Sequence, residues 1–148
     1  MKTFIFMLLA VVAGAILPIQ AALNGKMGKA VGDPVYAAFI SFVVGSIGLV
    51  IYLLATRTDL STLAEARTVH ASVWSAGILG AFYVACVIIL APKLGVALTF
   101  GLIVTGQLGI SLIIDNYGLL GIPVQTISWQ KIAGMLLIIG GVVLIRKF

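Results

Sequence analysis

Charged residues are what this sequence has least of. Only 9% of its 148 residues are charged and 62% are hydrophobic, whereas a soluble domain carries about 25% charged residues. A soluble fold is therefore excluded. The nine Lys and Arg residues are scattered over the ends of apolar stretches, a placement that suits anionic lipid headgroups and argues against a nucleic-acid partner.

Groups that carry catalysis or bind metals are also scarce. The chain has one cysteine, one histidine and four acidic residues. Cys86 lies inside an apolar stretch, so an intrachain disulfide and a cysteine-based metal cluster are excluded. His70 lies in a polar connection, with no Ser/His/Asp set, metal-ligand cluster or phosphate loop in the sequence. The sequence therefore predicts neither an enzyme nor a bound metal or cofactor.

Long uncharged stretches make up most of the chain. A helix needs about 20 apolar residues to cross a hydrocarbon core about 30 Å thick. We therefore expect an all-α integral membrane protein with a single transmembrane domain over residues 1–148. Its expected helices cover about residues 3–23, 34–55, 73–91, 95–114 and 128–146.

The first apolar stretch has a second interpretation. Met1-Lys2 followed by an apolar run resembles a signal peptide. The run extends through Gly25, which is long enough to span, and a cleavage after Ala21 would place Ile19 where a small residue is preferred. A retained first helix is therefore favoured, ending near Asn24-Gly25 and followed by a polar loop to Asp33.

Polar side chains inside an apolar span are costly and mark candidate sites. On the first helix these are Gln20 and Asn24, four residues apart on one face, either lining a cavity or forming a helix stop. On the third helix, Tyr83 and Trp74 are a candidate aromatic wall for a cation, with an interfacial anchor as the alternative for Trp74. On the fourth helix, the candidates follow one another at steps of four residues: Gln107, Ser111 and Asp115.

The fourth-helix residues leave alternatives open. Gln107 lies about 12 Å along the helix from Asp115, near the bilayer midplane if Asp115 is at the water boundary. Its carboxamide either is a ligand for a polar substrate or forms an interhelical hydrogen bond. Asp115 is a proton-coupling carboxylate, a cation site or a solvated helix terminus.

Several motifs taken together resemble a known family. They are Gln20-x-x-x-Asn24, Ser41-Phe42-x-x-Gly45, Pro92-Lys93-Leu94-Gly95, the stretch Gly106-Gln107-Leu108-x-x-Ser111-Leu112-x-x-Asp115-x-x-Gly118, and the closing Gly134 with Gly140-Gly141-Val142. The whole chain resembles the YdcZ type of the drug/metabolite transporter superfamily.

The resemblance implies both fold and function. It implies five helices that form half of a ten-helix inverted-repeat fold, in a multi-pass protein of the bacterial inner membrane. It also implies a secondary transporter that exports a small polar or cationic metabolite or drug. The small multidrug resistance relatives couple protons through a glutamate in helix 1, and this helix 1 has no acidic residue.

Positive charges on the two sides of the membrane are almost balanced. With five spans, one side holds Lys2, Arg57, Arg67 and Lys131, and the other holds Lys26, Lys29, Lys93, Arg146 and Lys147. The Lys/Arg bias sets orientation, and here it is four against five. We therefore expect an antiparallel homodimer inserted both ways. The alternatives are pairing with a paralogous half-transporter of fixed orientation, and a non-transporting assembly or scaffold subunit.

Overall fold

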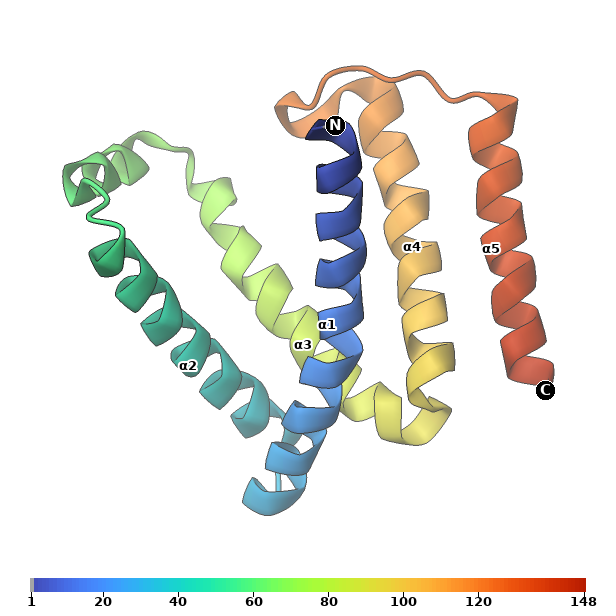
Figure 1. Cartoon of the computed structure of the whole chain (residues 1–148), viewed down its shortest axis with the longest axis horizontal. Helices are drawn as coiled ribbons and strands as arrows, with labels where there is room; N and C mark the ends of the chain where they lie inside the picture. The colour runs from blue at the N-terminus through green and yellow to red at the C-terminus, as the bar shows by residue number, and fades with distance from the viewer. Residues whose placement is uncertain (1) are drawn as a thin grey trace. The chain divides into compact units, whose positions relative to one another are not determined.

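The computed structural model describes residues 2–148, and all regular structure in this part is helical (Figure 1). The α-helices are α1 (Lys2–Val31), α2 (Pro34–Ala55), α3 (Ser75–Leu94), α4 (Val96–Tyr117) and α5 (Trp129–Lys147). Short 3₁₀ helices are η1 (Leu60–Thr68), η2 (Ala71–Trp74) and η3 (Leu119–Gly121). All five α-helices are long and apolar enough to cross a membrane, in α3 counting from Ala71. The prediction of an all-α membrane protein is confirmed.

The chain divides into two compact units. The first extends to Pro92 and holds α1, α2 and most of α3, and the second covers Lys93–Phe148 and holds α4 and α5. The single transmembrane domain expected over the whole chain stays a prediction.

Helix α1 is longer than the sequence suggested. It continues to Val31 rather than ending near residue 23, so the expected loop after Asn24 is helical. Gly28 lies inside this extension, where an added Cβ would be 3.5 Å from Ile88 Cγ2 and 3.6 Å from Pro34 Cα. Close packing of this segment on its neighbours outweighs the weak helix preference of glycine. The left-handed Gly32 (φ +78°) follows the end of α1.

Helix α2 begins where the sequence predicted. The Asp33 side chain accepts hydrogen bonds from the backbone N–H groups of Val35 (2.6 Å) and Tyr36 (3.2 Å), and Pro34 occupies the first helical position. An acceptor at the N-cap and a proline directly after it are both favourable at a helix start.

The helices of the first unit pack at one end only. Ala37 and Ala38 of α2 and Ile88 of α3 form its small buried core. Helix α1 packs on α2, with Ala21 and Asn24 buried. Figure 1 shows that α1 and α2 meet near the turn that joins them and separate toward their other ends. This divergence leaves space between them.

Helix α3 differs from the expected range at both ends. It begins at Ser75 after the 3₁₀ turn η2 and continues through Pro92 to Leu94, whereas the expected range was 73–91 and ended just before Pro92. Proline removes one hydrogen-bond donor, a small loss in the last turn. The left-handed Gly95 (φ +83°) follows the helix end instead.

The connection between α2 and α3 contains a short helix, η1. It begins after Asp59, whose carboxylate accepts from Ser61 N–H at 2.9 Å, although Thr62 and Glu65 have the spacing of a capping box. This backbone hydrogen bond, with a further one from the Ser61 side chain, lowers the pKa of the exposed Asp59.

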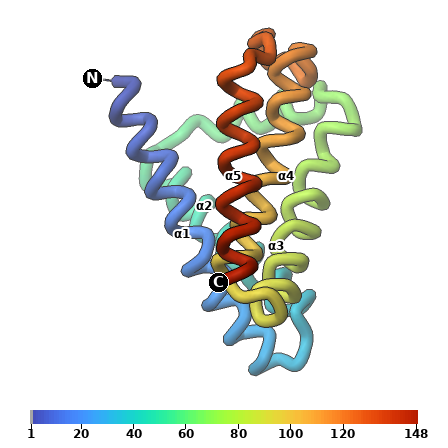
Figure 2. The backbone as a smooth tube through the Cα atoms, turned by 90° about the vertical axis from the view of Figure 1, so that its right-hand side faces the viewer, coloured from blue at the N-terminus to red at the C-terminus, as the bar shows by residue number. Residues whose placement is uncertain are grey.

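In the second unit, α4 and α5 lie side by side and run in opposite directions (Figure 2). Gly101 of α4 faces Val142 of α5, and Gly109 faces Met135. Thr105 lies between the two glycines, and its hydroxyl donates to the Gly101 carbonyl at 2.9 Å. Small side chains thus let the two backbones approach closely.

The α4–α5 connection is tied to both helices. Helix α4 runs to Tyr117, beyond the expected end at 114, and the left-handed Gly118 ends it. The Asp115 carbonyl accepts from Gln125 N–H at 2.8 Å, and the Asn116 side chain accepts from Ile127 N–H at 3.0 Å. Helix α5 begins at Trp129 after its Ser128 cap, one residue later than expected.

The tight α4–α5 contact yields a stability prediction. A Cβ at Gly101 would lie 2.9 Å from Val142 Cγ2, whereas a Cβ at Gly106 meets no atom within 4 Å. Both Gly→Ala changes gain helix propensity, but only Gly101→Ala overpacks, a cost of about 1–3 kcal/mol. We expect the Gly101→Ala variant to have a lower melting temperature in detergent than the Gly106→Ala variant, as measured by circular dichroism.

A second change separates overpacking from other effects. Val142→Ala should restore much of the stability lost by Gly101→Ala, because it removes the methyl group that clashes. Equal melting temperatures for Gly101→Ala and Gly106→Ala would contradict the close packing of α4 and α5.

Candidate functional site

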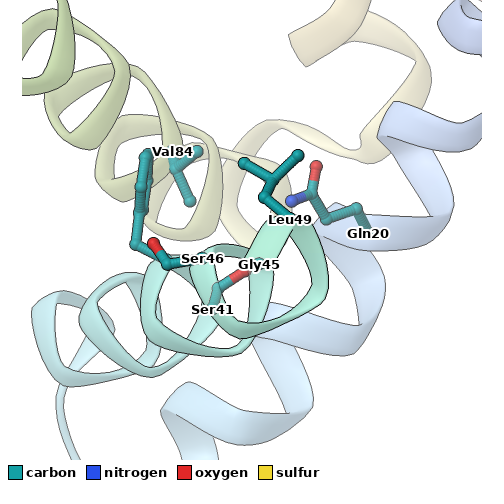
Figure 3. Close-up of a pocket in the computed structure, with 7 residues that line it drawn as sticks. Gln20, Ser41, Gly45, Ser46, Leu49 and Val84 are labelled. Carbon is teal, nitrogen blue, oxygen red and sulfur yellow. The ribbon is translucent and has the colours of Figure 1, made fainter. Parts of the chain in front are cut away.

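A cleft of about 390 Å³ with a partly polar lining opens in the first unit (Figure 3). Helix α1 contributes Gln20 and α3 contributes Val84. The remaining lining residues come from α2: Ser41, Phe42, Gly45, Ser46 and Leu49. The volume is within the range of about 300–1,000 Å³ that is usual for small-molecule sites.

The cleft lies where α1 and α2 separate. Ala21 is 5% exposed and Ala38 is 4% exposed on the packed side. Gln20 and Ser41 are half-buried at the edge of this contact, and Ser46 lies further along α2, where the helix is exposed. In Figure 3 the Gln20 side chain extends from α1 toward α2, close to Leu49. The divergence of two helices therefore places a carboxamide and two hydroxyls around one space.

The lining fits a neutral polar solute with an apolar part. The Gln20 carboxamide offers two N–H donors and a carbonyl acceptor, and each serine hydroxyl both donates and accepts. Phe42, Leu49 and Val84 supply apolar walls. Among the described residues, no charged side chain lines this cleft. Such a space can hydrogen-bond a solute without offering it a counter-ion.

Two other predicted residues of the first unit lie near the lining residues in sequence. Asn24 is one turn after Gln20 and is 9% exposed. Tyr83 precedes Val84 on α3, and its hydroxyl is buried without a hydrogen-bond partner in the described part of the chain. An unpaired buried hydroxyl costs about 1–3 kcal/mol, so a hydrogen bond from Tyr83 to water or solute would be favourable.

Sequence reasoning did not select the two serines of the cleft. Ser41 was named only in the motif Ser41-Phe42-x-x-Gly45 behind the family resemblance, and neither serine was among the predicted site residues. Their hydroxyl groups within an uncharged stretch were the available signal. Whether these serines face the same space as Gln20 depends on the angle between α1 and α2, and the sequence does not report that angle.

The remaining predicted residues lie in the second unit. Gln107 and Ser111 are exposed on α4, and Asp115 is half-buried in its last turn. None of these three side chains forms a hydrogen bond within residues 2–148. The convergence of the predicted residues of both units on one path stays a prediction.

Two further hollows are less suited to a polar solute. A groove of about 550 Å³ between α2 and α3 has only apolar walls, among them Phe39, Phe42 and Phe82. A hollow of about 300 Å³ between α4 and α5 is apolar except for Lys131. The Lys131 ammonium donates to the carbonyls of Gln125 (3.3 Å) and Thr126 (3.1 Å), so it holds the α4–α5 connection. No group of three metal-binding side chains occurs within residues 2–148.

Comparison with known proteins identifies a family for this chain. Residues 5–144 match the model of the family described as "Putative inner membrane exporter, YdcZ". Searches of curated proteins and of solved structures returned no significant match. The family match covers nearly the whole chain and includes every residue of the cleft.

Water in the cleft can be tested with single cysteines. In a Cys86→Ala background, Ser46→Cys places a thiol in the cleft, and Val44→Cys places one on the 62%-exposed outer surface of the same helix. The thiolate is the form of cysteine that attacks water-soluble thiol reagents, and it forms in water and not in lipid. We expect rapid labelling at 46 and little at 44 in membranes. Equal protection of both would contradict a hydrated cleft.

Proposed function

The chain belongs to the YdcZ family of inner-membrane exporters, and we propose that it is a secondary transporter that works as an antiparallel homodimer. Its cargo is a small polar or cationic metabolite or drug, carried across the bacterial inner membrane. The observation that carries this proposal is the cleft at Gln20, Ser41 and Ser46, a polar space inside a helix pair whose outer surface is apolar.

The cleft is the proposed substrate site of each copy. Polar groups at membrane depth are tolerated where they line a cavity, and Gln20 and the serines are placed in this way. Asn24 and Tyr83 extend the site along α1 and α3. Because the described lining carries no charge, the cleft alone favours neutral hydrogen-bonding solutes over permanent cations.

Helix α4 supplies the remaining polar groups of the proposed path. Gln107 is a hydrogen-bonding group at mid-helix, and Ser111 follows it one turn later. Asp115 provides a carboxylate at the end of the span, where it raises the local cation concentration or carries a proton. A cationic cargo would depend on Asp115, and a neutral cargo would depend mainly on Gln20.

The near balance of positive charge supports the antiparallel dimer. The Lys and Arg residues of the two sides number four and five by the alternation of the five spans. Since the Lys/Arg bias directs insertion, the chain has little preference for one orientation. Two oppositely inserted copies reproduce the inverted repeat that surrounds a central site in many transporters.

The substrate site can be tested with a matched pair of variants. Gln20→Leu removes the carboxamide of the cleft, and Gln130→Leu makes the same change on the exposed start of α5. Uptake into proteoliposomes is measured for a panel of small neutral amides, alcohols and quaternary ammonium cations. We expect Gln20→Leu to lose at least about tenfold in rate, the equivalent of one charge-free hydrogen bond of about 1.4 kcal/mol.

The control decides how this result is interpreted. Gln130→Leu should transport at the wild-type rate with the same panel member, because it leaves the cleft intact. Equal rates for Gln20→Leu and wild type would remove the cleft from the transport path. Failure of the wild-type protein to transport any panel member above empty liposomes would favour the scaffold alternative.

Dual insertion can be tested on intact cells. A single cysteine is placed at Phe148, which is 95% exposed, in the Cys86→Ala background. An impermeant thiol reagent should label about half of the molecules, because equal insertion in both orientations exposes half of the C-termini. Labelling of all or of none would show a fixed orientation and support the paralogous half-transporter.

A further inference from the structure

One polar side chain on α4 lacks a partner at the depth where a partner is most needed. Gln107 is exposed, and its carboxamide forms no hydrogen bond within the described chain. By contrast, the hydroxyls of Thr99 and Thr105 on the same helix donate to the carbonyls of Gly95 (2.7 Å) and Gly101 (2.9 Å). Lipid cannot replace the missing hydrogen bonds of Gln107.

The position of Gln107 along α4 is central. Helix α4 covers Val96–Tyr117, so Gln107 lies about 16 Å from its first residue and about 15 Å from its last at 1.5 Å per residue. The face toward α5 carries Gly101, Thr105 and Gly109 instead. Gln107 lies on a different row of the helix, with Ile103 one turn before it and Ser111 one turn after it.

Central depth has a particular consequence for an antiparallel pair. A two-fold axis in the membrane plane exchanges the two leaflets, so only a residue at the midplane meets its own counterpart at the same depth. Residues on either side of it meet residues of the opposite half. On α4, therefore, Gln107 can pair with the second copy's Gln107, and position 103 of one copy matches the depth of position 111 of the other.

Glutamine is chemically suited to such self-pairing. A carboxamide carries both donors and an acceptor, so two of them can exchange N–H···O hydrogen bonds across a two-fold axis. One N–H of each amide stays free, and so does one lone pair of each carbonyl. The pair therefore keeps hydrogen-bonding groups for a passing solute.

We infer that the Ile103–Gln107–Ser111 row of α4 is the surface on which a second, oppositely inserted copy of this chain docks, with the two Gln107 carboxamides paired at mid-membrane. This inference rests on the antiparallel dimer of the proposed function and specifies its surface. The occupant is a second copy because the unpaired group is self-complementary, is central in its span and belongs to a chain with almost balanced charge.

Cysteine cross-linking in native membranes tests the inference. All variants carry Cys86→Ala, and chains with two different tags are co-expressed and oxidised. Gln107→Cys should form a disulfide-linked dimer, because its counterpart lies at the same depth and on the facing surface. Leu102→Cys is the matched control, 49% exposed on the same helix and about 140° around it from Gln107. It should stay monomeric.

A mixed pair of variants reports the direction of pairing. Ile103→Cys in one tagged chain and Ser111→Cys in the other should cross-link to each other, with little self-linking of either. In an antiparallel pair the two copies of position 103 are separated by about 12 Å along the axis, too far for a disulfide. A parallel pair would give the reverse pattern, with self-links at 103 and at 111, and would overturn the inference.

Failure of the inference can be told apart from failure of the proposed function. If Gln107→Cys and the mixed pair both stay monomeric while half of the C-termini label from outside, the docking surface is wrong and the antiparallel transporter stands. If labelling also shows a single orientation, the antiparallel assembly itself is wrong. A Leu102→Cys dimer as strong as that of Gln107→Cys would show non-specific collision and overturn the assigned surface.

Discussion

The requirement that polar groups be satisfied inside a lipid environment governs this protein. Helices meet the requirement for the backbone, which is why helices make up nearly all of the described chain. Some polar side chains meet it locally: Asp33 caps α2, Thr99 and Thr105 bond to their own helix, and Lys131 holds the connection before α5. Gln107, which has no such partner, and Gln20, which lines the cleft, are among the side chains on which function can depend.

The cleft follows from an unequal contact between two helices. Small and compact residues near the α1–α2 turn let the backbones approach, and the buried Ala37 and Ala38 mark this point. Beyond it, both helices carry larger, exposed side chains and separate. The polar residues at the point of separation are thus held by a rigid contact on one side and open on the other. A solute site at that point requires no loop.

Much of the fold could be predicted from the sequence because each span is marked by an uncharged stretch of sufficient length. The start of α2 was predictable from Asp33-Pro34, where capping chemistry is local. The end of α1 was not, because Asn24-Gly25 has the local character of a helix stop while the tertiary contact of Gly28 with α2 and α3 keeps the segment helical. Pro92 does not end α3, because the loss of one hydrogen bond in the last turn of a helix is a small penalty.

The site was only partly predictable. Gln20 and Gln107 were identified because a polar side chain in a span is conspicuous, and the structure now distinguishes them, with Gln20 in a cleft and Gln107 on an open helix face. Identifying Ser46 as a cleft residue requires the angle between α1 and α2. How the two units of the chain combine depends on contacts between helices, and the pattern within a single helix does not encode these contacts. The relation between Gln20 and Gln107 depends on the same contacts.

We propose that transport needs two copies of the chain in opposite orientations, and fixing the orientation of each copy tests this requirement. Leu63→Lys with Thr126→Lys adds two positive charges to one side of the spans, and Val31→Lys with Phe148→Lys adds two to the other, at exposed positions in both cases. Each locked chain should insert one way. We expect that neither locked chain transports alone and that co-expression of both restores wild-type flux. Wild-type flux from either locked chain alone would contradict it.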